Sequence, residues 1–181
     1  MISFFDPMFQ IEQARTEDAF GIVDGDEQHP AYTTLENSVE WTAQVENLHK
    51  EVALFIPVDK NMPLHSPDGR QLKTCDGMLT LPNKKQDLLI FLELKTGKTR
   101  NRKNWINHGI EQLESTIAEF RRYHDDAMRA DKRAYVCNGK RPMQREFSQE
   151  RAQRFFDNTG FRLYIDHVVR IVSRNVPSQM S

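Results

Sequence analysis

The chain has 181 residues, of which 38% are hydrophobic and 28% charged, and its formal net charge is −1. These values are ordinary for a globular protein, and the two cysteines, Cys75 and Cys137, are expected as reduced core thiols and not as a disulfide framework. No apolar run approaches the about 20 residues that cross a bilayer, and the N-terminal residues lack the basic flank of a signal peptide. We therefore expect a soluble cytoplasmic protein that contacts no membrane.

Acidic residues are concentrated at the start of the chain. Residues 1–30 carry seven acidic residues and one basic residue, which leaves 24 basic against 19 acidic residues in the rest. We divide the chain into an acidic N-terminal extension at residues 1–33, packed on or appended to the core, a domain at residues 34–175, and a disordered tail at residues 176–181.

Eight helices and strands are expected from residue 37 onward. In chain order they are a helix from residue 37 or 38 to 47, strands at 52–58, 73–81 and 88–95, a helix at 105–128, a strand at 133–137, a helix at 148–158 that ends at Gly160, and a strand at 162–172. This order predicts an α/β fold with a central mixed sheet flanked by helices.

The segments 73–81 and 88–95 predict a hairpin with a defined register. A proline and five polar residues separate the two strands. The shortest connection of this kind is a hairpin loop, which pairs Leu81 with Leu88. Counting five residues from that pair along each strand places Asp76 opposite Glu93, with both side chains on one face. Lys95 shares that face, whereas the opposite face carries only apolar side chains and a glycine.

The opposed carboxylates predict a metal site. The Cβ atoms of directly opposed residues lie about 4.5–5.5 Å apart, so two ionised carboxylates would repel each other. Mg²⁺ offsets such repulsion because it takes carboxylate oxygens and keeps several waters, and Mn²⁺ is expected to substitute for it. An ammonium group such as that of Lys95 can then orient the attacking water. The alternative is an ordinary surface ion pair between Glu93 and Lys95.

Asp76 and the triplet Glu93-Leu94-Lys95 resemble the motif of the PD-(D/E)XK nuclease superfamily, which includes restriction-endonuclease-like and Holliday-junction-resolvase-like enzymes. Cys75 stands where the proline of the family name is expected. The expected order of helix, three strands, helix and strand is similar to the family core, followed here by an additional C-terminal helix and strand. The resemblance implies a Mg²⁺-dependent endonuclease or exonuclease that hydrolyses phosphodiester bonds in DNA with metal-activated water.

The resemblance also implies two further site residues. The family usually adds a glutamate from the first helix, and Glu46 is chosen as this third metal ligand because it shares the apolar stripe of that expected helix. Glu36 is the next candidate, and Glu40 points away. Several family members use a glutamine on the helix after the E-x-K strand, and Gln112 takes this place. The alternatives are a solvent-facing Glu46 and a Gln112 at the rim of an amphipathic helix.

Basic residues follow the E-x-K strand and predict contacts to nucleic acid. Lys98, Arg100, Arg102 and Lys103 could line the path of a phosphate backbone, and Trp105 either stacks on a base or lies in the core. The acidic extension is expected to lie away from the surface that would contact nucleic acid. Cleavage of both strands of a duplex would favour a homodimer. Two other hypotheses remain open: a nuclease-fold accessory subunit that binds nucleic acid or a partner protein, and a regulatory protein that binds its partner through the acidic segment.

Overall fold

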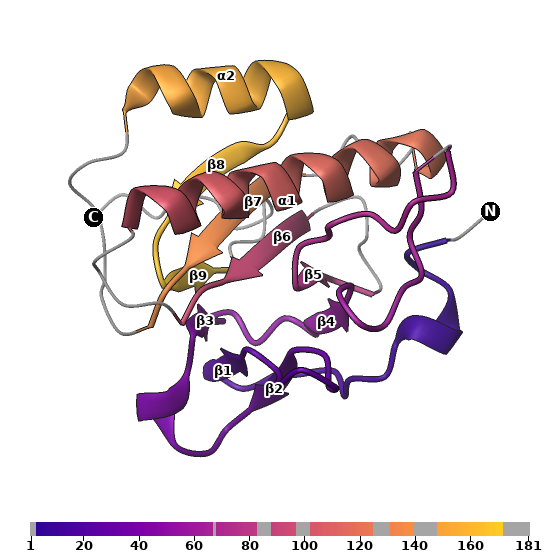
Figure 1. Cartoon of the computed structure of the whole chain (residues 1–181). Helices are drawn as coiled ribbons and strands as arrows, with labels where there is room; N and C mark the ends of the chain where they lie inside the picture. The colour runs from indigo at the N-terminus through magenta and orange to yellow at the C-terminus, as the bar shows by residue number, and fades with distance from the viewer. Residues whose placement is uncertain are drawn as a thin grey trace.

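The computed structural model in Figure 1 describes residues 3–66, 68–82, 88–96, 102–124, 131–139 and 148–171, without the side chains of residues 102 and 103. Two α-helices lie on one side of a five-stranded sheet, and a four-stranded sheet lies on the other side (Figure 1). In this part of the chain, no helix is long and apolar enough to cross a membrane. The elements in chain order are η1 (Pro7–Phe9), β1 (Ala19–Val23), β2 (Tyr32–Thr34), η2 (Ser38–Glu40), β3 (Ala43–Glu46), β4 (Leu54–Pro57), β5 (Gly77–Thr80), β6 (Leu88–Leu94), α1 (Arg102–Tyr123), β7 (Asp131–Cys137), α2 (Gln149–Thr159), β8 (Arg162–Ile165) and β9 (Val168–Arg170).

The five-stranded sheet has the order β4-β5-β6-β7-β8. Strands β4, β5 and β6 are antiparallel neighbours, whereas β7 and β8 continue the sheet in parallel to β6. Every residue of β6 is buried, as expected of an apolar strand that is covered on both faces. The pairs between β5 and β6 run from Gly77 with Leu92 to Thr80 with Leu89. This register confirms the predicted hairpin and, continued by one residue, sets Asp76 opposite Glu93.

Two separate apolar cores lie on the two faces of this sheet. Helices α1 and α2 cover one face, and the core between them and the sheet, here called the helix-side core, includes Met78, Leu89 and Phe91. The four-stranded sheet, in the order β2-β1-β3-β9, covers the other face. The prediction that helices flank both faces is therefore wrong for the second face. Alternate residues of β1 and β3, such as Phe20 and Val45, bury their side chains there, as a strand does and a helix does not.

The helix expected at residues 37–47 is absent, and this prediction is wrong. Residues 38–40 form a single 3₁₀ turn, and β3 follows with alternating buried and half-buried residues. Leu35 and Val39, which had suggested an apolar helical stripe, are 49% and 87% exposed. Asn37 adopts a left-handed conformation and its side chain caps nothing. Among the described residues, the architecture is α/β with two mixed sheets and two α-helices.

The elements in the second half agree more closely with the sequence. In helix α2, the Ser148 side chain accepts a hydrogen bond from the backbone nitrogen of Arg151, and Gly160 ends the helix with a φ of 75°. The predicted end of this helix at Gly160 is confirmed. The single strand expected at 162–172 is two strands, because Asp166 accepts a hydrogen bond from the backbone nitrogen of Val168 at 3.2 Å and the chain turns there. Strand β8 joins the five-stranded sheet, and β9 joins the other sheet. The tail at residues 176–181 lies outside the described residues.

The N-terminal segment belongs to the fold. Strands β1 and β2 form half of the four-stranded sheet, and Phe4 is fully buried in the helix-side core. The Phe4 ring meets Phe91, Phe120 and His124 edge-on, with ring centroids 5.2–6.3 Å apart. Cys75 and Cys137 are both buried and free, which confirms the prediction of reduced core thiols.

Replacement of Phe4 tests this assignment. Phe4→Ala is expected to lower the free energy of unfolding by about 3–5 kcal/mol, because it removes a buried ring and leaves a cavity. Urea unfolding followed by circular dichroism measures the change. Met8→Ala, at a side chain that is 69% exposed, is the control and should stay within about 0.5 kcal/mol of the wild type. An equal effect of both substitutions would contradict the burial of Phe4.

Candidate metal and catalytic site

Asp76 and Glu93 meet at one end of the β5–β6 hairpin, on the face covered by α1. The Asp76 Oδ2 atom accepts a hydrogen bond from the backbone nitrogen of Leu94 at 2.6 Å, so its side chain is held against the strand that carries Glu93. Glu93 is only 1% exposed, and Asp76 keeps a partly exposed edge. The hairpin thus brings two carboxyl groups together at a buried site with one accessible side.

Lys95 and Gln112 complete this group. The Lys95 ammonium forms an ion pair with Glu93 Oε1 and donates a hydrogen bond to Gln112 Oε1 at 3.0 Å. The Gln112 side chain donates in turn from Nε2 to the Thr74 carbonyl at 3.0 Å, so its amide is fixed from both ends. The structure therefore brings Asp76, Glu93, Lys95 and Gln112 together, although only the first three were derived from the hairpin.

Two hydrogen bonds, made by Gln112 and by Thr116, hold helix α1 over the site. Thr116 accepts a hydrogen bond from the backbone nitrogen of Cys75 at 2.8 Å, one turn beyond the Gln112 contact. Gly109 lies directly over Glu93, where an added Cβ would approach Glu93 Cγ to 3.1 Å. The missing side chain at residue 109 lets the helix come close, and the helix then excludes water from Glu93.

The two carboxyl groups of the site are only partly compensated by positive charge. Burial raises the pKa of Glu93 to about 9, and the nearby Asp76 carboxylate adds to this rise, against the opposing effect of Lys95. Burial likewise raises the pKa of Asp76 to about 7, although the bond from Leu94 lowers it. The Glu93 Oε2 atom is buried and has no hydrogen-bond partner. Two hard oxygen donors, one of them without a partner, fit a divalent cation.

The prediction that a first-helix glutamate joins the site is wrong. Glu46 lies on β3 in the other sheet, where its Oε2 atom is 3.0 Å from Nε of Arg170 on the adjacent strand. Glu36 and Glu40 are exposed. Within the described ranges, no three His, Cys, Asp or Glu side chains lie close enough to share a metal ion, so Glu46 does not complete a triad with Asp76 and Glu93.

Asp24 is a site neighbour that the sequence analysis missed. It follows β1, and its charge raises the pKa of both Asp76 and Glu93. The expectation that the whole acidic extension lies away from the site is therefore wrong for this residue. The position of Asp24, directly after an apolar strand and before a glycine, could have marked it as a candidate site residue. The local sequence did not show where that strand, β1, would lie relative to the β5–β6 hairpin.

The predicted nucleic-acid contacts lie mostly beyond the described structure. Lys98 and Arg100 fall outside the described residues, as do the side chains of Arg102 and Lys103. Trp105 is described, and its ring packs against the helix-side core. Trp105 is half-buried, which favours the core tryptophan among its two alternatives.

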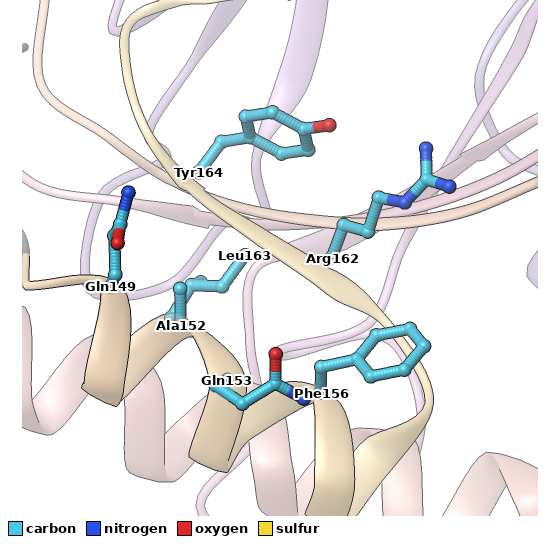
Figure 2. Close-up of a pocket in the computed structure, with 7 residues that line it drawn as sticks. All are labelled: Gln149, Ala152, Gln153, Phe156, Arg162, Leu163 and Tyr164. Atoms are coloured by element: carbon cyan, nitrogen blue, oxygen red, sulfur yellow. The ribbon is translucent and has the colours of Figure 1, made fainter.

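A concave region lies between α2 and β8 (Figure 2). Gln149, Ala152, Gln153 and Phe156 line it from the helix, and Arg162, Leu163 and Tyr164 line it from the strand. No carboxylate, thiol or histidine is among these seven residues, so this region lacks the side chains that usually bind a metal ion.

Comparisons with known proteins do not assign the chain to a family. A scan against family models, a search of curated proteins and a search of solved structures found no match. Functional inference for this site therefore depends on its own geometry and chemistry.

The raised pKa of Glu93 predicts how stability depends on pH in protein stripped of divalent cations. Between about pH 4.5 and 9 the unfolded chain loses the Glu93 proton and the folded chain keeps it, so the wild type loses stability as pH rises. Glu93→Gln does not titrate, and it should be more stable than the wild type at pH 8 by on the order of 1–3 kcal/mol. At pH 4 the difference should be small.

Urea unfolding in EDTA at the two pH values measures this difference. Glu40→Gln, at an exposed residue, is the control and should change stability by less than about 0.5 kcal/mol at either pH. A Glu93→Gln variant that is less stable than the wild type at pH 8 would contradict the assignment of an uncompensated buried carboxyl.

Proposed function

We propose that this protein is a metal-dependent nuclease of the PD-(D/E)XK type that hydrolyses phosphodiester bonds in DNA. The observation that supports this most strongly is the convergence of Asp76, Glu93 and Lys95 at one hairpin end, with Glu93 Oε2 buried and unpartnered. The succession β4, β5, β6, α1, β7 also fits the three strands, helix and strand of the family core. The helix that precedes them in the family has no counterpart at residues 37–47.

Asp76 and Glu93 would hold the Mg²⁺ ion, with Mn²⁺ able to replace it. When bound, such a cation neutralises charge on the phosphate and lowers the pKa of a coordinated water. The Lys95 ammonium, held between Glu93 and Gln112, orients the attacking water and stabilises the negative charge that develops on the phosphate. Gln112 keeps that ammonium in place, because its own amide is anchored to the Thr74 carbonyl.

The proposal extends to the surroundings of this site. Lys98, Arg100, Arg102 and Lys103 follow β6 in the sequence and would contact the DNA backbone as positive charges. Cleavage of both strands of a duplex would favour two such sites related by a two-fold axis, as in a homodimer in the cytoplasm.

Cleavage assays with site variants test the function. With Mg²⁺ or Mn²⁺ and a panel of circular plasmid, four-way junction and single-stranded DNA, the wild type should cut at least one substrate. Glu93→Gln and Lys95→Ala should each lower the rate by about 100-fold or more, because they remove a charge needed at the reacting phosphate. Glu46→Gln is the control and should cut at the wild-type rate.

The assay has two informative negative results. Equal cleavage by the wild type and Glu93→Gln would contradict the mechanism. Binding to these DNAs without cleavage under any condition would favour the alternative, an accessory subunit that uses a nuclease fold to bind nucleic acid or a partner protein.

The role of Gln112 can be tested separately. Gln112→Ala should lower kcat by about 10–100-fold with little change in KM, because Lys95 would lose its anchor while DNA contacts remain. Gln153→Ala, on the exposed face of α2, is the matched control and should leave kcat unchanged. An increase in KM alone would show that Gln112 contacts the substrate and does not position Lys95.

A further inference from the structure

The loop after β1 carries an acidic residue from the four-stranded sheet to the candidate site. Asp24 follows the last residue of β1, and its backbone nitrogen lies 3.4 Å from the Thr42 hydroxyl. Lys60 ties the same loop to the end of β4, because its Nζ atom donates to the Asp26 carbonyl at 2.7 Å. The neighbouring Asp59 nitrogen donates to the Cys75 carbonyl at 3.2 Å, so this anchor lies beside Asp76.

Asp24 lies at the wall of an open cavity. The cavity has a volume of about 500 Å³ and is lined by Glu12, Asp24, Gly25, Asp26, His29, Pro30, Ala31 and Tyr32. The loop that forms it is tightly closed, because a Cβ at Gly25 would lie only 2.1 Å from the His29 carbonyl oxygen. Asp24 therefore lies in a closely packed loop at the edge of this cavity.

The charges around Asp24 connect it with the candidate site. Burial raises the pKa of the Asp24 carboxyl, the charges of Lys60 and Lys95 lower it, and the charge of Asp59 raises it. The Asp24 charge in turn raises the pKa of Asp76 and of Glu93. Only one ammonium, that of Lys95, pairs directly with the hairpin carboxylates among these groups. The unpartnered Glu93 Oε2 shows that the positive charge present leaves part of the site unsatisfied.

We propose that Asp24 is the third acidic group of the site and holds the hydration shell of the divalent cation bound by Asp76 and Glu93. This inference rests on the proposed function. Asp24 acts through water, since the described residues include no three acidic side chains within direct reach of one ion. Mg²⁺ suits this arrangement because it gives up its waters reluctantly, and the acidic cavity attracts cations toward the site.

Mn²⁺ binding to metal-free protein tests the proposal without any activity measurement. Titrations followed by electron paramagnetic resonance give the affinity, and water-proton relaxation reports the hydration of the bound ion. Asp24→Asn should weaken Mn²⁺ binding by about 10–100-fold and change the relaxation of the bound ion, as loss of an outer-shell partner does. If this variant does not fold, Asp24→Ser replaces it, and circular dichroism identifies the folded variant.

The matched control is Asp18→Asn, the same change just before the first residue of β1, where Asp18 is 65% exposed and pairs with Lys50. It should bind Mn²⁺ as the wild type does. Asp24→Asn with unchanged affinity and relaxation would overturn the role of Asp24, while loss of binding in Glu93→Gln would still support the proposed function. Equal binding by the wild type and Glu93→Gln, or none by the wild type, would overturn both.

Discussion

The antiparallel pairing of β5 with β6 places two carboxyl groups opposite each other under a helix, and the rest of the site follows from this constraint. Two ionised carboxylates at such a separation would repel each other, and burial removes the water that would otherwise screen them. The surrounding structure nevertheless holds them there. The backbone of Leu94 fixes one carboxyl group, and α1 approaches over Gly109 to enclose the other. Under the proposed function, a cation bound between these two groups would replace the proton that burial otherwise favours on Glu93.

The charges at the site have a clear imbalance. One ammonium faces two carboxyl groups, with a third nearby on the β1–β2 loop. Lys95 is also engaged on two sides, by Glu93 and Gln112, and so has limited freedom to satisfy other groups. A divalent cation would add the missing positive charge without another side chain. The electrostatics of the site are therefore consistent with the metal binding that the proposed function requires.

Local sequence predicted those parts of the molecule that local patterns decide. The short polar connection between two apolar strands defined the hairpin register, and helical periodicity with capping residues located α1 and α2. The prediction for residues 37–47 failed because a short run with apolar residues at mixed spacing fits both a helix and a strand. The pairing of β3 with β1 and β9 decides in favour of a strand. Asp24 was missed for the same reason, since its neighbours at the site come from distant parts of the chain.

The pairing of β3 with β9 has a consequence for how the polypeptide is made. These two strands come from the first and last thirds of the sequence, and the carbonyl of Glu46 accepts from the nitrogen of Ile171 at 2.9 Å. During synthesis, the edge of β3 that pairs with β9 stays unpaired until β9 has left the ribosome. Premature termination just before β9 would leave that edge permanently open, and the truncated product would be prone to aggregate through strand addition between chains.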